Sequence, residues 1–333
     1  MRNPNSPHLD RRSLLRVAST LAALSAVPPA LCRKALAESP AGPSPFTLEI
    51  APGVHAHKGH VALSSRENEG DISNAGFIVG REAVAVIDTA DDLRLHAAIR
   101  SVTDLPIRYV INTHMHPDHV LGNAAFEADK PAFVGHHKLA RGLSARAERY
   151  LAINKEAIGE EAFAGTTIVL PTMAIHERTT LDLGGREIVL EPQKTAHTDN
   201  DLTVRDSTTG TLFLGDLLFS EHIPTLDGSI LGWLAVLDSL TRTPAERVVP
   251  GHGPHAMDWP DAAKPIRHYL EVITGEIRTM IKDDRTLSDA TASVGLSEKD
   301  AWKLFEDYHA RNVSAQRRHR RTRPWSTPTA RHL

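Results

Sequence analysis

The chain has almost no cysteine. Cys32 is the only one among its 333 residues, and it lies in a segment with the features of a cleaved export signal. Cleavage after Ala37 would leave a mature protein without cysteine, which excludes disulfide bonds and thiolate metal ligands. Any metal site would then have to be built from carboxylates and from the chain's 19 histidines.

The chain also lacks an excess of charge of either sign and a hydrophobic run of membrane-spanning length. Its formal net charge is −3, which argues against nucleic-acid binding through bulk charge. The apolar run at 17–31 is too short and too weakly apolar for a stable transmembrane helix. We therefore expect no nucleic-acid partner and no stable membrane span after the signal is removed.

Residues 1–37 have the order of an export signal. Arg11 and Arg12 precede the apolar run, and the small residues at 35–37 offer a cleavage site. The paired arginines resemble a twin-arginine signal, so a periplasmic location is expected. A general secretory signal or a basic amphipathic N-terminus is the competing interpretation. A Pro/Gly/Ser linker at 38–45 follows.

Residues 46–312 alternate between apolar runs of strand length and amphipathic segments. Strands are expected at 46–50, 53–59, 75–80, 83–88, 107–113, 179–192 (two strands around a Gly-Gly turn), 201–216 (a hairpin) and 248–253, and helices at 91–102, 139–163 and 260–310. The strands come in two batches, each followed by helix, which indicates a layered α/β domain with two related halves. The basic residues 313–333 are expected to form a disordered tail, although a basic tail can also bind nucleic acid or anionic membrane.

Three histidines and an aspartate crowd the end of one expected strand, in the sequence HMHPDH. Residues two apart on an extended segment point the same way, so His114 and His116 project together. Pro117 suits the first position of a helix, which places Asp118 and His119 in its first turn. The four side chains converge on one point and offer ligands for zinc, and also for iron or manganese.

Further candidate ligands follow three later strand-like runs. His197 lies in a polar loop, Asp216 ends an apolar strand, and His252 lies between two glycines at another strand end. Strand ends and the loops beside them are where α/β proteins assemble their sites. All seven residues are therefore expected to meet in one site.

The ordered set H-x-H-x-D-H, a later His, Gly-Asp and Gly-His-Gly resembles the metallo-β-lactamase-fold superfamily over roughly residues 46–310. The resemblance implies a four-layer αβ/βα sandwich with a site for two zinc ions at one edge of the facing sheets. It also implies a bridging hydroxide as the nucleophile, with Asp118 orienting it and carrying a proton. The implied ligands are His114, His116 and His197 for one zinc, Asp118, His119 and His252 for the other, and Asp216 between the two.

Asp216 narrows the class that the resemblance implies. A bridging carboxylate at this position resembles the glyoxalase II, lactonase and ribonuclease Z side of the superfamily rather than true β-lactamases. The sequences AHTDNDLTV, RVVPGHGP and DYHARNVS are similar to the exported quinoprotein relay system zinc metallohydrolases, also described as SoxH-like. That similarity implies association with a periplasmic quinoprotein dehydrogenase and supplies no substrate.

Three side chains outside the implied metal ligands are expected to contact the substrate: Glu221, His222 and His136. For His136, an ordinary loop position near the site is the competing interpretation. The alternating histidines His55, His57 and His60 have no carboxylate among them, so they are expected to be structural or exposed. Trp233 is expected to lie in the core.

The expected function is that of an exported dinuclear zinc hydrolase acting on a small ester, thioester, lactone or amide. Two alternatives stay open. One is a persulfide-dioxygenase-like enzyme, which uses a single iron and needs fewer of these ligands. The other is an accessory protein without turnover that binds a quinone cofactor or its dehydrogenase. A nuclease is disfavoured because export places the protein away from RNA.

Overall fold

A computed structural model describes residues 46–90 and 93–321, all within one compact unit. The predicted signal at 1–37 and the linker at 38–45 lie outside these described residues. Among the described helices, none is long and apolar enough to cross a lipid bilayer.

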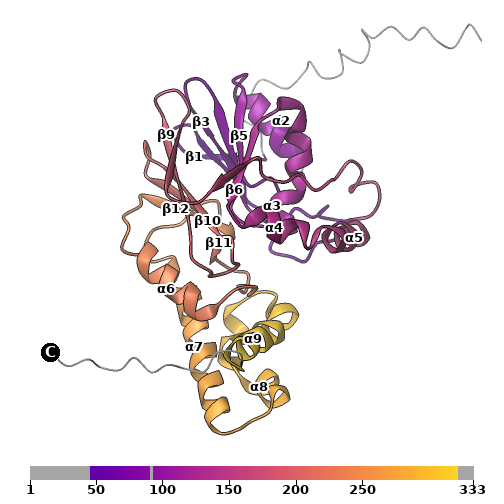
Figure 1. Cartoon of the computed structure of the whole chain (residues 1–333), viewed down its shortest axis with the longest axis vertical. Helices are drawn as coiled ribbons and strands as arrows, with labels where there is room; N and C mark the ends of the chain where they lie inside the picture. Colours follow the sequence, from indigo (N-terminus) through magenta and orange to yellow (C-terminus); the bar gives the residue numbers. More distant parts are fainter. Residues whose placement is uncertain (1–45, 91–92, 322–333) are drawn as a thin grey trace, which may run out of the picture. The chain divides into compact units, whose positions relative to one another are not determined.

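The first half of the described chain forms a seven-stranded sheet, called here the N-terminal sheet (Figure 1). Its strands lie in chain order: β1 (Leu48–Ala51), β2 (Val54–His57), β3 (Ala75–Val79), β4 (Val84–Ile87), β5 (Ile107–Asn112), β6 (Ala132–His136) and β7 (Met173–Ile175). The first four strands pair antiparallel, whereas β4 to β7 pair in parallel. Parallel pairs need crossover connections, and these connections carry the helices of this half.

The second half contributes a five-stranded sheet, the C-terminal sheet, in the order β12-β11-β10-β9-β8. Its strands are β8 (Thr179–Asp182), β9 (Glu187–Pro192), β10 (Leu202–Asp206), β11 (Thr211–Phe219) and β12 (Arg247–His252). The β11–β12 pair is parallel, and the other pairs are antiparallel. A helix therefore crosses between β11 and β12.

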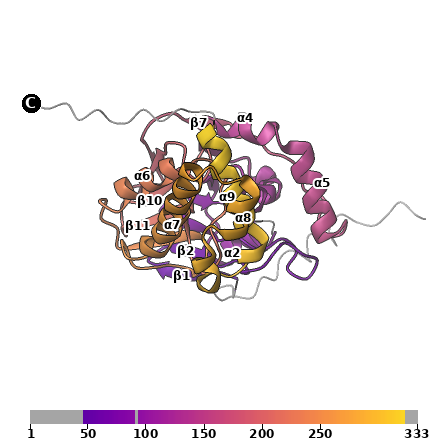
Figure 2. The ribbon, with the colours of Figure 1, turned by 90° about the horizontal axis from the view of Figure 1, so that it is seen from below.

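The helices follow the same division between the two halves. The first half holds α2 (Leu93–Val102), α3 (Pro117–Val120), the 3-10 helix η1 (Leu121–Asp129), α4 (Leu139–Ser144) and α5 (Ala147–Ile158). The second half holds α6 (Ile230–Leu240), α7 (Ala263–Lys282), α8 (Leu287–Ser293), the 3-10 helix η2 (Leu296–Ala301) and α9 (Phe305–Arg321). In Figure 2, α7, α8 and α9 lie side by side.

Four layers pack around three large apolar cores, and a smaller cluster joins Met115 to α4. The inner core lies between the two sheets and joins side chains such as Ile87 and Ile111 to Leu190 and Phe213. An outer core packs α2 and η1 on the N-terminal sheet, and another packs α6 and α7 on the C-terminal sheet (Figure 1). The layer order of helix, sheet, sheet and helix confirms the predicted αβ/βα sandwich.

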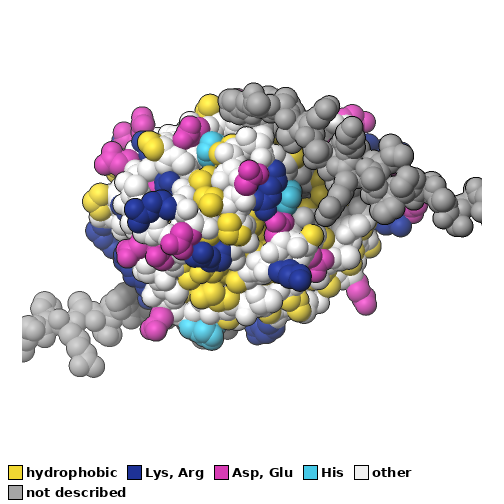
Figure 3. Space-filling view, turned by 90° about the horizontal axis from the view of Figure 1, so that it is seen from above, with side chains coloured by type: hydrophobic (Ala, Val, Ile, Leu, Met, Phe, Trp, Pro, Cys, Tyr) yellow, Lys and Arg dark blue, Asp and Glu magenta, His cyan; other side chains and the backbone are white. Residues whose placement is uncertain are grey.

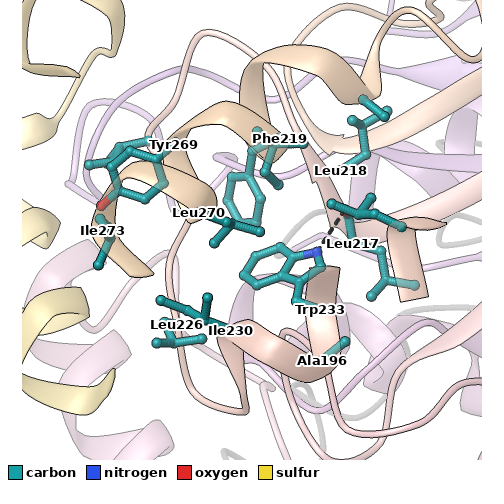
Figure 4. Close-up of a cluster of buried hydrophobic side chains, with 14 of the residues drawn as sticks. Ala196, Leu217, Leu218, Phe219, Leu226, Ile230, Trp233, Tyr269, Leu270 and Ile273 are labelled. Carbon is teal, nitrogen blue, oxygen red and sulfur yellow. Dashed lines mark hydrogen bonds between the residues drawn. The ribbon is translucent and has the colours of Figure 1, made fainter. Parts of the chain in front are cut away.

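The central strands are apolar throughout because both of their faces are buried. On β4, Ala85 and Ile87 point into the inner core, whereas Val84 and Val86 point into the outer core beside α2. Alternation with a period of two divides one continuous apolar run between two cores. Trp233 of α6 is fully buried in the core on the C-terminal sheet, and its Nε1 donates to the Leu217 carbonyl at 3.0 Å (Figure 4). This confirms the core position predicted for Trp233.

The helix at the C-terminal end extends further than the sequence indicated. The tail was expected from residue 313, but α9 continues to Arg321. Val313 is fully buried in the core on the C-terminal sheet, so burial of this face holds the helix beyond the expected boundary. The rest of the predicted tail, 322–333, lies outside the described residues.

Charged side chains are mixed on the face of the molecule drawn in Figure 3. Acidic and basic groups alternate there with small groups of apolar side chains, and no patch of one sign covers the described part of that face. Charges of both signs are thus interspersed on that face.

Candidate metal centre

Six of the seven residues predicted as metal ligands lie at strand ends or in the segments beside them, whereas Asp216, expected to end its strand, lies within β11, which continues to Phe219. His114 and His116 follow β5, and Asp118 and His119 lie in the short helix α3 that Pro117 begins. The later three come from the second half of the chain: His197 from the loop before β10, Asp216 from β11 and His252 from the end of β12. The structure gathers all seven into two groups whose ligand atoms lie within 4.8 Å of one another, His114, His116, His197 and Asp216 in one and Asp118, His119 and His252 in the other.

The carboxylate of Asp216 lies between the two groups. Its Oδ2 is 3.6 Å from His114 Nε2 and 3.3 Å from His197 Nε2. Its Oδ1 is 3.1 Å from His119 Nε2 and 3.4 Å from His252 Nε2. Each oxygen therefore faces one group, which is the arrangement a carboxylate needs to bridge two cations.

Each imidazole of the centre has an outward partner for one of its nitrogens. Nδ1 of His197 faces the Thr225 carbonyl at 2.7 Å, and Nδ1 of His252 faces the Ile72 carbonyl at 2.8 Å. Because a carbonyl only accepts, these rings donate outward and turn the lone pair of Nε2 toward the centre.

The other three rings are held in the same way. The Asp88 carboxylate lies 2.9 Å from Nδ1 of His119, and the Asp227 carboxylate lies 3.3 Å from Nε2 of His116. The Thr113 hydroxyl donates to Asp88, so it is left to accept from Nδ1 of His114 at 3.1 Å. All five imidazoles thus aim one nitrogen inward, Nδ1 for His116 and Nε2 for the others.

The imidazole nitrogens and carboxylate oxygens that point into the centre are better suited to binding metal ions than to hydrogen-bonding with one another. Three of them are buried without a hydrogen-bond partner: His114 Nε2, His119 Nε2 and Asp216 Oδ1. A buried polar atom without a partner carries a desolvation cost that a bound cation removes. Nε2 of His197 and Nδ1 of His116 lie 2.9 Å apart, where two lone pairs repel unless a proton or a cation lies between them. The donor set of five imidazole nitrogens and two carboxylates suits zinc.

Two glycines explain why the motifs read Gly-Asp and Gly-His-Gly. Gly215 has φ +50, a left-handed conformation that glycine adopts without strain, and it precedes Asp216 on a buried strand. A Cβ at Gly251 would collide with Oδ1 of Asp216. The chain therefore needs glycine here for the β12 backbone to approach the bridging carboxylate.

The imidazoles of the centre differ in the direction in which their surroundings shift the pKa. Burial lowers the pKa of His197 to about 3 and the pKa of His114 well below its usual value. Burial acts in the same direction on His252, but Asp216 and Asp118 override it and raise the pKa of His252 to about 9. A cation that binds at His252 has to displace this proton, so metal uptake weakens in acid.

A cavity of about 550 Å³ opens onto the centre. Its floor includes His116, Asp118, Asp216 and His252, and one wall is formed by α5. Other lining residues come from the loop after β11 and from α9: His222, Thr225, Asp227, Tyr308 and Arg311. A small molecule can therefore reach the carboxylate of Asp118 and the inward side of the centre.

Of the three residues predicted to contact substrate, one lines the cavity and two do not. His222 lines the cavity, with its ring 4.9 Å from that of His252. Glu221 and His136 do not line it, and their contact with substrate stays a prediction. Lys58 and Lys303 hold the Glu221 carboxylate at 3.3 and 2.8 Å. His136 is buried on β6, with its ring stacked on that of His137.

The prediction that the alternating histidines are structural or exposed is confirmed for all three. His55 and His57 are buried, His57 lies 2.6 Å from the Asp71 carboxylate, and His60 is exposed. Two acidic residues at the centre were not predicted, Asp88 and Asp227. Asp88 follows β4 directly, and an acidic residue at a strand end is a signal that the sequence does contain. Asp227 lies in a loop with no local pattern to mark it.

Replacing Asp227 with alanine is expected to weaken metal binding by roughly 10–100-fold, the usual effect of losing a partner that orients a ligand imidazole. The reason is that His116 loses the carboxylate beside its Nε2, and Nδ1 is no longer held toward His197. Competition with a chromophoric chelator measures the affinity. Asp261→Ala, which removes an exposed carboxylate paired with Lys264, is the matched control. Equal affinities for the two variants would contradict a role for Asp227.

Comparison with known proteins agrees with this fold. Residues 68–252 match the family model of the metallo-beta-lactamase superfamily. The metallo-beta-lactamase from Pontibacter korlensis is similar at 18% identity and a TM-score of 0.51, with 66% of this chain and 96% of that chain covered. The enzyme of the same name from Hirschia baltica is similar at 17% identity and a TM-score of 0.51, with 67% and 96% covered.

A longer protein is also similar in structure. A double mutant of the sec-alkyl sulfatase PisA1 gives a TM-score of 0.56 at 15% identity, with 74% of this chain and 45% of that chain covered. At these identities the likeness shows that the fold is shared, and it carries no information about the substrate. No curated protein matches the chain.

Proposed function

Since the chain belongs to the metallo-beta-lactamase superfamily, whose members are mostly metal-dependent hydrolases, we propose that it is a dinuclear zinc hydrolase. Its substrate is a small ester, thioester, lactone or amide that enters the cavity above the centre. The observation that carries the proposal is the position of Asp216, whose two carboxylate oxygens face different groups of candidate ligands. A centre for a single metal would have no use for the second group.

The residues at the centre have different roles in the proposed hydrolysis. Two zinc ions, when bound, would lower the pKa of a shared water and polarise the carbonyl oxygen of the substrate. Asp118 faces the cavity and lies 3.3 Å from His252 and 3.5 Å from His119. Burial would raise the pKa of Asp118, but these two imidazoles lower it well below its usual value. Its ionised carboxylate can orient the attacking water and hold a proton for the leaving group.

The same proposal includes export and a cellular role. The sequence of residues 1–37 supports export to the periplasm by the twin-arginine route, and the similarity to quinoprotein relay system metallohydrolases supports association with a quinoprotein dehydrogenase. Asp216 as a bridging ligand supports an ester-type substrate over a β-lactam. A substrate panel that includes a chromogenic cephalosporin tests this preference directly.

Metal content measured beside a hydrolase panel tests the proposal. The full-length chain loaded with zinc is expected to hold two zinc ions and to hydrolyse at least one ester, thioester, lactone or amide of the panel. His116→Ala is expected to lose zinc and hydrolysis together, because Nδ1 of His116 points into the centre. A single iron per chain would contradict the dinuclear zinc centre and favour a persulfide-dioxygenase-like enzyme.

A second outcome would contradict turnover itself. If no member of the panel is hydrolysed and the chain recovers a quinoprotein dehydrogenase in a pull-down, the accessory role replaces the enzymatic one. Metal content would then still test whether the centre is built as proposed.

A further inference from the structure

Two helices that do not supply the candidate ligands bring arginines to the cavity. Arg146 immediately precedes α5, and Arg149 lies within that helix. Arg311 belongs to α9, and all three line the cavity that opens onto the centre. α5 and α9 come from different halves of the chain (Figure 1), so the fold, not a local motif, places these cations around one opening.

Each carboxylate that lines the cavity either is a candidate metal ligand or accepts hydrogen bonds from other side chains. Among the described lining residues, the acidic side chains are Asp118, Asp216 and Asp227. Asp118 and Asp216 belong to the centre, and Asp227 accepts from both His116 and Arg146, each at 3.3 Å. Arg149 and Arg311 make no hydrogen bond or ion pair within 46–90 and 93–321. Two exposed guanidinium groups are thus left at the cavity without a carboxylate that they hydrogen-bond, and Asp227, the cavity carboxylate whose charge acts on Arg311, is shared with His116 and Arg146.

Aromatic and apolar side chains line the same cavity as these arginines. Tyr150 and Ile153 of α5 lie on the cavity, and Tyr308 of α9 lies there too. Tyr308 is half-buried, and its ring centroid is 5.1 Å from that of His222. A bound molecule would therefore meet the centre, apolar side chains and positive charge within one cavity.

From this arrangement we propose that the substrate carries an oxyanion, a carboxylate or a sulfonate, on a short apolar tail beyond the bond that is cleaved. Arg149 and Arg311 bind the oxyanion while the centre receives the cleaved group. This deepens the proposed hydrolase function and rests on it for the cleavage step. Guanidinium groups suit the task because each presents a planar fork of donors to an oxyanion.

Matched esters test the proposal on the zinc-loaded full chain. The anionic probes are mono-4-nitrophenyl adipate and 4-nitrophenyl 5-sulfopentanoate, and the neutral probe is methyl 4-nitrophenyl adipate. The double variant Arg149→Gln, Arg311→Gln is expected to lower the anionic-to-neutral ratio of kcat/KM by about tenfold, mainly through a higher KM. The two anionic probes distinguish a carboxylate from a sulfonate as the preferred group.

Two further variants separate these arginines from general charge. Arg149→Lys with Arg311→Lys keeps the charge and is expected to restore most of the ratio. Arg141→Gln removes an exposed arginine of α4 that lies outside the cavity, and it is expected to leave the ratio unchanged. A preference for anions that came from the zinc ions alone would survive in the double glutamine variant, and that result would overturn the proposal.

A binding measurement keeps this proposal separate from the hydrolase proposal. Calorimetry with the ketone 6-oxo-8-phenyloctanoate, which has no hydrolysable bond, beside neutral 1-phenyloctan-3-one, measures the anion contribution without turnover. Weaker binding of the anionic ketone by the glutamine variant in a protein that cleaves no ester would sustain the anion site and reject the hydrolase. Equal binding and equal ester ratios in an active enzyme would reject the anion site and sustain the hydrolase.

Discussion

Replacing Asp216 with asparagine is expected to lower bound zinc from two ions to at most one per chain and to reduce kcat/KM by at least about 100-fold, the upper end of the loss from removing an outer partner of a ligand. An amide offers a single oxygen, so it can face only one of the two groups that the carboxylate faces now. The substitution also removes the negative charge beside His119 and His252. Elemental analysis after dialysis measures the zinc, and the best ester of the panel measures the rate.

Asparagine has nearly the same size and shape as aspartate, so the substitution tests the charge of Asp216 and its ability to bridge two metal ions. Gly251 leaves room for a side chain of the size of Asp216, so the β12 backbone has no reason to move. Asp238→Asn on α6, which removes an exposed carboxylate paired with Arg267, is the matched control and is expected to keep both zinc ions. Two zinc ions retained by Asp216→Asn would show that the carboxylate does not bridge.

Replacing Trp233 with alanine is expected to lower the free energy of unfolding by about 3–5 kcal/mol, the usual cost of removing a large aromatic side chain from a core. Trp233 is fully buried against β11, its Nε1 donates to the Leu217 carbonyl, and its ring lies 5.2 Å from that of His197 (Figure 4). The variant leaves a cavity and a carbonyl without its donor. Denaturation followed by circular dichroism, after zinc has been removed with a chelator, measures the change without the contribution of bound metal.

The same helix supplies a control for Trp233. Leu231 is 45% exposed, and Leu231→Ala is expected to change the unfolding free energy by less than about 1 kcal/mol. If Trp233→Ala were as stable as Leu231→Ala, the packing of α6 on the C-terminal sheet described here would be wrong. Weaker zinc binding by Trp233→Ala at 25 °C would further show that this core supports His197.

The sequence predicts most of the fold because its periodicity is local. The Gly-Gly turn between β8 and β9 and the hairpin of β10 and β11 lie close to where the residue pattern places them. The layered arrangement follows from two batches of strands and helices. The helical region expected at 139–163 is divided into α4 and α5, and the end of α9 was missed because burial of Val313 depends on contacts distant in sequence.

Some residues of the candidate centre can likewise be predicted from local sequence, whereas others depend on contacts between residues distant in sequence. His114, His116, Asp118 and His119 stand in one short motif, and strand ends mark the later candidates. Asp227 becomes visible only when the fold brings it to His116, 111 positions away. Arg149 and Arg311 lie on solvent-exposed helix faces whose sequences are typical of any surface helix. Their meeting at one cavity depends on the packing of α5 and α9, which no local pattern encodes.

Anomalous diffraction at the zinc edge, from crystals of the zinc-loaded full chain, tests the central claim most directly. The account predicts two peaks. One lies among His114, His116 and His197, the other lies among Asp118, His119 and His252, and one oxygen of Asp216 contacts each. A single peak, or a second peak that Asp216 does not contact, would contradict the two-metal centre.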